Sequence, residues 1–202
     1  MSASSPENVP QTRVPRADAS EGRLRIERGI DRTTITTDPK LGDLLHGSWK
    51  WKPKVTAEDG VVTLTYPRFR LARQGSDEIT LNATVPWDIS IHGSVHRLGA
   101  DLRGLKLRSF SVEGGASRLV LVLGKPDQNV HLDLRSADKV TIRRPRDTQV
   151  RVRIAKGATQ VSVDDQYYRA IGGETILTTG PIVWNDYHLN VTGARRLRVT
   201  TL

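Results

Sequence analysis

A pair of small residues recurs along the second half of the chain at a nearly constant interval, and this repeat constrains the fold more than any other feature. The pairs are Gly93 and Ser94, Gly115 and Ala116, Ser136 and Ala137, Gly157 and Ala158, and Gly193 and Ala194. The steps between them are 22, 21, 21 and 36 residues. Apolar residues alternate with polar ones on both sides of each pair, which is typical of half-buried strands. Each unit is therefore expected to be a strand, a tight bend and a second strand.

The apolar positions that follow each pair are in phase with the repeat. After the last four pairs they are Leu119 and Leu121, Val140 and Ile142, Val161 and Val163, and Leu197 and Val199. A unit of this length cannot bury its apolar face alone, whereas stacked units form a continuous core. The sequence thus predicts an all-β protein, a single-domain β-solenoid in which these side chains form aligned inward ladders. A β-sandwich is the alternative, because its short strands recur at similar spacing.

Composition divides the chain into three regions. Residues 1–20 are rich in Ser, Pro and charge, so we expect a disordered tail whose deletion leaves the melting temperature unchanged. Residues 21–85 contain short β-branched runs separated by turns, and we expect this N-terminal β region to cap the stack. Residues 86–202 hold the solenoid repeats, and the step of 36 residues implies an inserted loop at about 166–185.

The insertion carries three large aromatic residues, Tyr167, Tyr168 and Trp184. We expect them to form a cap or a partner-binding loop over apolar strands. The last repeat ends close to Leu202, and an uncovered final unit would present free strand edges. If the insertion does not reach that edge, we expect self-association into a dimer or a filament.

Positive charge is concentrated in the repeats. Residues 86–202 carry 18 of the 31 Lys and Arg residues but only 11 of the 22 Asp and Glu residues. The residue before the first apolar position that follows each small pair is polar: Arg97, Arg118, Lys139, Gln160 and Arg196. Because the next residue faces the core, these side chains should point outward, and stacked units lie about 4.8 Å apart. Adjacent cations at that spacing repel one another unless carboxylates or a bound anion intervene.

Two interpretations of this row stay open. In the first, the long basic side chains shield the turns, pair with neighbouring acids such as Asp138, and remain solvated. In the second, Arg97, Arg118, Lys139 and Arg196 bind a polyanion or an acidic protein. Such binding would be weak, without sequence preference, and steeply weakened by salt.

No catalytic residue, metal site or cofactor is expected. Nucleophile-elbow, phosphate-loop, dinucleotide-binding and zinc-protease motifs are absent, and the chain has no cysteine. His92 and His96 flank a turn and lack the convergent geometry of metal ligands. Asp164 and Asp165 are adjacent in the sequence, so they point to opposite faces of a strand and are expected to form a solvated strand end.

Several segments resemble a known bacterial family. They are residues 85–93 (VPWDISIHG), 100–112 (ADLRGLKLRSFSV), 114–119 (GGASRL), 164–166 (DDQ) and 170–173 (AIGG). These motifs are similar to those of the toast-rack or "putative adhesin" family of stacked-strand domains, in its actinobacterial branch. Related domains end the LiaF-type proteins of the cell-wall-antibiotic response. The resemblance implies the stacked-strand fold, and the shared motifs are structural, since the family has no established activity.

These observations favour a non-catalytic interaction or assembly module. An envelope-stress regulatory or adhesin-like domain is the alternative that the resemblance implies. A carbohydrate-active enzyme is a third possibility, although no row of carboxylates on one face supports it. No signal peptide or apolar membrane span is visible in the sequence, so a cytoplasmic location is expected.

Overall fold

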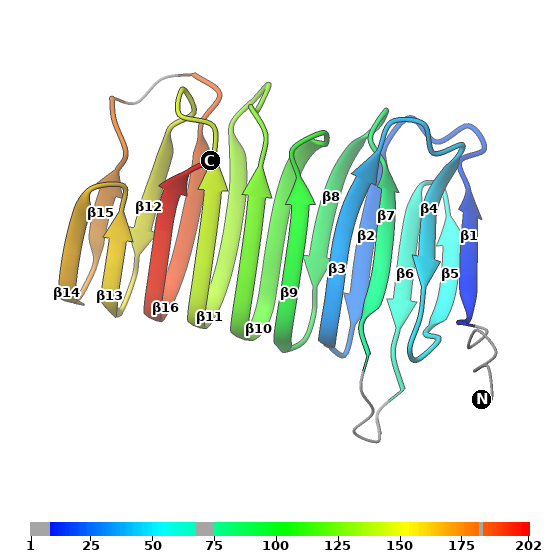
Figure 1. Ribbon diagram of the computed structural model, residues 1–202, viewed down its shortest axis with the longest axis horizontal. Coiled ribbons are helices and arrows are strands. Elements are labelled where there is room, and N and C mark those ends of the chain that lie inside the picture. The colour runs from blue at the N-terminus through cyan, green and yellow to red at the C-terminus, as the bar shows by residue number, and fades with distance from the viewer. Residues whose placement is uncertain (1–8, 68–74, 182–183) are drawn as a thin grey trace, which may run out of the picture.

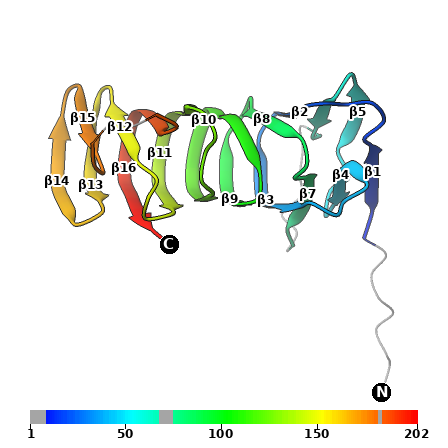
Figure 2. The same ribbon diagram turned by 90° about the horizontal axis from the view of Figure 1, so that it is seen from above.

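The computed structural model describes residues 9–67, 75–181 and 184–202. These residues form an all-β structure of strands joined by short turns. The strands lie side by side along the long axis of the molecule (Figure 1), and a view from above shows them in two facing layers (Figure 2). The described part of the chain contains no helix that could span a membrane.

A single strand serves both layers because it bends at the small dipeptide. The first half of β10 (Lys106–Leu123) pairs in parallel with β8 (Pro86–Ile91), and its second half pairs in parallel with β9 (Val95–Leu102). Gly115 and Ala116 lie where the partner changes. We call the two layers the β8 face and the β9 face. The long strands β11 and β16 pass from one face to the other in the same way.

Each face is a mixed sheet with parallel strands at its centre and antiparallel strands at its ends. The β8 face contains, in spatial order, β15 (Thr175–Thr178), β12 (Val150–Ile154), the first halves of β16 (Tyr187–Thr201), β11 (Val130–Arg144) and β10, then β8, β2 (Gly22–Glu27), β6 (Val61–Thr65) and β5 (Lys54–Glu58). The β9 face contains β14 (Gln166–Gly172), β13 (Gly157–Val163), the second halves of β16, β11 and β10, then β9, β3 (Ile30–Asp38), β7 (Asp77–Asn82), β4 (Asp43–Ser48) and β1 (Gln11–Pro15).

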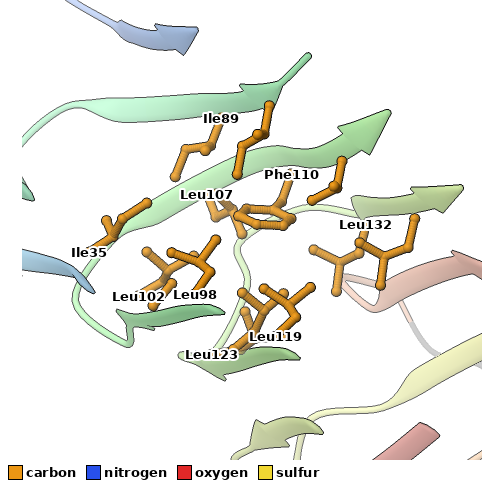
Figure 3. Close-up of a cluster of buried hydrophobic side chains, with 14 of the residues drawn as sticks. Ile35, Ile89, Leu98, Leu102, Leu107, Phe110, Leu119, Leu123 and Leu132 are labelled. Atoms are coloured by element: carbon orange, nitrogen blue, oxygen red, sulfur yellow. The ribbon is translucent and has the colours of Figure 1, made fainter. Parts of the chain in front are cut away.

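The inward ladders predicted from the repeat are confirmed. Leu119 lies opposite Val140, which lies opposite Leu197, and Val161 follows in the same row. Each of the eight predicted ladder side chains is at most 2% exposed. Figure 3 shows the two faces meeting, with Leu107 and Phe110 from the β8 face packed toward Leu119 and other aliphatic side chains from the β9 face. Aliphatic ladders from both layers therefore form one continuous core.

The spatial order of the units departs from their order in the sequence at both ends. The last strand, β16, lies between β11 and the β12–β13 unit. In the same way, β2 and β3 lie between β6–β7 and β8–β9. Both terminal parallel units are thus inside the stack, each covered by a unit that is nearer the middle of the sequence. The step of 36 residues arises because the chain forms two further strands, β14 (Gln166–Gly172) and β15 (Thr175–Thr178), before it returns to form β16.

The segment predicted as an inserted loop forms strands. Residues 166–172 form β14, which pairs antiparallel with β13, and residues 175–178 form β15, which pairs antiparallel with β12. The prediction of an inserted loop was wrong for these residues, because they form strands that extend the sheets and cover the unit beyond β16. Residues 182–183 of that prediction lie outside the described residues.

The region 21–85 does more than cap the stack. Strands β2, β3, β6 and β7 continue the parallel pairing of the repeats. Only β1, β4 and β5 pair antiparallel and end the stack on this side. The stacked architecture therefore begins well before the first recognisable small dipeptide.

The predicted disordered tail was wrong from residue 11 onward. Gln11–Pro15 forms β1, which pairs antiparallel with β4. Val14 is 5% exposed, and the Trp49 indole N–H donates to the Thr12 hydroxyl at 3.0 Å. A single buried apolar residue gives too little periodicity to be recognised, but β4 offers it a strand edge. Residues 1–8 lie outside the described residues.

Deleting residues 1–16 is expected to lower the melting temperature by roughly 5–10 °C, because it exposes Leu45 and Trp49 as well as removing Val14. Differential scanning calorimetry of the truncated and full chains measures this. Deleting only residues 1–8 is the control and should leave the melting temperature within about 1 °C, within the usual effect of surface changes. Equal melting temperatures for the full chain and the longer deletion would contradict the role of β1.

Candidate functional site

A row of five cations crosses the outer surface of the β9 face. Arg32 lies opposite Arg97, Arg97 opposite Arg118, Arg118 opposite Lys139, and Lys139 opposite Arg196. We call these five residues the basic row. Lys139 is half-buried and the other four residues are exposed. Neighbouring strands lie about 4.8 Å apart, so the row extends over about 19 Å.

The structure changes the membership of the row that the sequence predicted. Gln160 does not interrupt it, because β16 separates β11 from β13 and brings Arg196 directly beside Lys139. Arg32 was missed, because its strand lies before the recognised repeats. The signal was present, since residues 30–33 (IDRT) match residues 95–98 (VHRL) in register.

The basic row lacks internal neutralisation. Among the described residues, no ion pair joins any of its five cations to a carboxylate. Asp138, which the sequence suggested as a partner for such a cation, pairs with Arg195 at 2.8 Å. Asp101, on the same face, is bound by Arg103 at 2.6 Å, and that hydrogen bond lowers the pKa of the Asp101 carboxyl.

The β8 face has a different arrangement of charged side chains. On and beside the β8 face, Arg108 contacts Glu21 at 2.5 Å, and this bond holds the pKa of the Glu21 carboxyl below its usual value. Arg153 pairs with Glu174 at 2.7 Å, and Arg23 also reaches Glu21. Both faces carry ion pairs and unpaired cations, but on the β8 face Arg25 and Arg151 lie opposite uncharged residues such as Ser90 and His188. Only the β9 face, within the described strands, brings five cations directly opposite one another.

A shallow hollow of about 470 Å³ lies along the N-terminal half of the basic row. Arg32, Arg97 and Arg118 line it together with Thr34 and Gly99. Gly99 lies between Thr34 and Val120 in the adjacent outward row, and a side chain added there would meet nothing within 4 Å. The missing side chain leaves a gap in the outer surface beside three guanidinium groups.

The other candidate polar residues are dispersed or structural. Within the described residues, no group of three or more His, Cys, Asp and Glu side chains could hold a metal ion. The His92 ring pairs with Glu113 at 2.9 Å. Asp164 is not a solvated strand end, because its carboxylate accepts a hydrogen bond from the guanidinium of Arg144, which is buried. That expectation was therefore wrong for Asp164.

Two of the three aromatic residues predicted as a cap lie in the outermost strand of the β9 face. Tyr167 and Tyr168 belong to β14, where Tyr167 is 64% exposed and Tyr168 is partly buried against the core. Trp184 is 90% exposed. Tyr168 alone of the three contributes to covering the core.

Comparison with known proteins finds a solved structure with a similar all-β fold and a family that matches most of the chain. The crystal structure of a "putative cell adhesion protein" from Clostridium sporogenes has a similar fold, with a TM-score of 0.71 at 18% identity, covering 95% of this chain and 97% of that one. No curated protein matches the chain. The family described as "N-terminal domain of toast_rack, DUF2154" matches residues 4–137. The chain belongs to this toast-rack family, as the sequence motifs predicted.

Proposed function

We propose that this chain is a non-catalytic interaction module, a β-solenoid that binds an extended anionic polymer along the basic row of its β9 face. The observation that supports this most strongly is the row itself. Cations directly opposite one another in a sheet destabilise it, and two unit charges 4 Å apart in water still repel by about 1 kcal/mol. Five in succession without carboxylate partners cost stability, and a bound polyanion would offset that cost.

The shape of the face suits a ribbon-like ligand more than a compact one. The basic row is straight because its members are in register on parallel strands. Hydroxyl groups of Thr34, Thr141 and Ser162 stand in the adjacent outward row. Guanidinium groups bind carboxylate or sulfate, and hydroxyls exchange hydrogen bonds with sugar hydroxyls. An acidic polysaccharide combines both kinds of group.

The similar fold of the Clostridium sporogenes protein is compatible with this proposal, since adhesion is an interaction function. A shared fold does not by itself imply a shared ligand. The proposal therefore rests on the chemistry of the β9 face. If the anionic polymer belongs to a cell surface, binding it would be an adhesin-like function.

Replacing the whole basic row with glutamine is expected to abolish retention on immobilised heparin at low salt. The fold should survive, because removing like-charge repulsion leaves the melting temperature unchanged or raises it. The measurement is the salt concentration at which each protein elutes, together with its melting temperature.

The matched control removes the same number of charges from the β8 face. Its five substitutions, all to glutamine, are at Arg25, Lys54, Lys106, Arg135 and Arg151, none of which forms an ion pair among the described residues. This variant has the same net charge as the first and should keep most of its retention. If the two variants elute together, net charge alone explains the binding and the basic row is not the binding face.

A further inference from the structure

The two ends of the stack are finished in different ways. At the N-terminal end the core is closed by Trp49 and Tyr66, both 0% exposed and in edge-to-face contact with ring centres 6.5 Å apart. Proline lies within or beside both outermost strands, at Pro15 in β1 and at Pro53 just before β5. Proline and charged residues are the usual devices that block an edge strand from pairing with another chain.

The C-terminal end has fewer of these devices, since Arg169 is the one charged residue of β14 and β15 has none. Strand β14 pairs only with β13, and β15 pairs only with β12, so one edge of each has no partner in the described structure. No proline occurs between residues 166 and 178. Ile176 of β15 is 58% exposed and Tyr167 of β14 is 64% exposed. Tyr168 and Ile171 cover the core only in part. An unblocked edge beside exposed apolar groups is a template for strand addition.

We propose that this end is a dimer interface at which β14 pairs antiparallel with β14 of a second copy. A two-fold axis normal to both layers places β14 beside its copy in one layer and β15 beside its copy in the other. Both free edges are then used in one contact, and the partly covered core ends face each other. The blocked N-terminal end cannot complete a head-to-tail contact, so the assembly closes as a dimer instead of growing into a filament.

The residues of β14 select one register for this pairing. Tyr168 faces inward opposite Val161, whereas Tyr167 faces outward opposite Ser162. A two-fold axis normal to the sheet keeps inward side chains facing inward, so each inward residue must lie opposite an inward residue of the partner copy. The axis therefore passes midway between one residue and its own copy, which we describe as an axis at that residue. An axis at Arg169 would set two guanidinium groups opposite each other, which is unfavourable.

An axis at Tyr168 removes that conflict. Arg169 then lies opposite Tyr167 of the partner copy, twice by symmetry, and each pair can form a cation–π contact. The two copies of Tyr168 meet inside, over the joined core. Both β9 faces point to the same side of such a dimer, so the two basic rows could engage one polymer together. The dimer itself does not depend on the proposed anion binding.

A single engineered thiol tests both the interface and its register, because the natural chain has no cysteine. Residues directly opposite in an antiparallel pair have Cα atoms about 4.5–5.5 Å apart, which suits a disulfide. Tyr168→Cys should therefore give a cross-linked dimer under mild oxidation. Arg169→Cys would lie diagonally from its copy at about 7–8 Å and should cross-link poorly. Thr56→Cys, exposed on β5 at the other end, should remain monomeric on denaturing gels.

Sedimentation velocity across a concentration series gives an independent answer without altering Tyr168. The wild type should be a dimer at high micromolar concentration. Ala170→Lys adds a charge at an exposed position of β14, opposite the exposed Thr159. It should be a monomer with the melting temperature that the wild type has at concentrations too low for the dimer, and Thr56→Lys should remain a dimer. A strictly monomeric wild type, or association abolished by Thr56→Lys and not by Ala170→Lys, would overturn the proposal. Heparin retention is measured separately, so loss of the dimer and loss of anion binding remain distinguishable.

Discussion

Leu121→Asp is expected to leave the protein without a cooperative unfolding transition. Leu121 is 0% exposed and lies in register between Ala100 and Ile142. A carboxylate there has no hydrogen-bonding partner, and burying an unpaired charge costs many kcal/mol unless the group takes up a proton. Even the protonated form loses a buried leucine, which contributes about 2–5 kcal/mol. The combined loss is comparable to the whole stability of a typical domain, about 5–15 kcal/mol.

Val120→Asp is the matched control, because Val120 is the preceding residue on the same strand and points outward. It introduces the same carboxylate one position away, where water solvates it, and should change the free energy of unfolding by less than about 1 kcal/mol. Near-ultraviolet circular dichroism and urea titration distinguish the two variants. A folded Leu121→Asp protein with a sharp transition would contradict the assigned register.

Arg144→Met is expected to reduce the free energy of unfolding by about 1–3 kcal/mol, because it leaves the partly buried carboxylate of Asp164 and two backbone carbonyls without their donor. Arg144 is 2% exposed and donates to the carboxylate of Asp164 and to the carbonyls of Pro145 and Arg146. Its own carbonyl accepts from the N–H of Leu202 at 2.8 Å. The residue thus joins the end of β11, the following corner and the turn between β13 and β14, across the end of β16.

The double variant separates the ion pair from packing. Asp164 has φ of 48°, a left-handed conformation that asparagine adopts readily, so Asp164→Asn is the partner substitution with least backbone strain. Arg144→Met combined with Asp164→Asn should lose less than the sum of the single losses, because no charge remains without its partner. Urea denaturation of the four proteins measures the coupling. Strictly additive losses would show that Arg144 acts by packing alone.

Sequence periodicity predicted what each unit looks like but not which units are neighbours. The in-phase aliphatic residues after the small dipeptides specified the register of β10 against β11, and the structure has that register. The position of β16 between β11 and β12–β13 has no counterpart in the repeat, because all parallel units present similar edges. Their order is decided by long-range packing of the whole stack, which local patterns do not encode.

The candidate site was predicted only in part, because sequence periodicity shows which residues are in phase but not which strands are neighbours. Arg97, Arg118 and Lys139 follow one another at steps of 21 residues, so their outward row was visible in the sequence. Arg32 joins the row from a strand 65 residues before Arg97, which no search at a fixed step would reach. The sequence also did not predict which charges pair. Asp138 is adjacent in the chain to Lys139, but it pairs with Arg195 of a neighbouring strand.

The salt dependence of heparin binding tests the central claim most directly. Each cation that contacts a polyanion releases counterions, so the logarithm of the association constant falls linearly with the logarithm of salt concentration. Replacing Arg97 and Arg118 with glutamine should reduce that slope by about two, roughly one for each phosphate-like contact removed. Replacing Arg25 and Arg151 on the β8 face should leave the slope nearly unchanged. Equal slopes for all three proteins would contradict binding along the basic row.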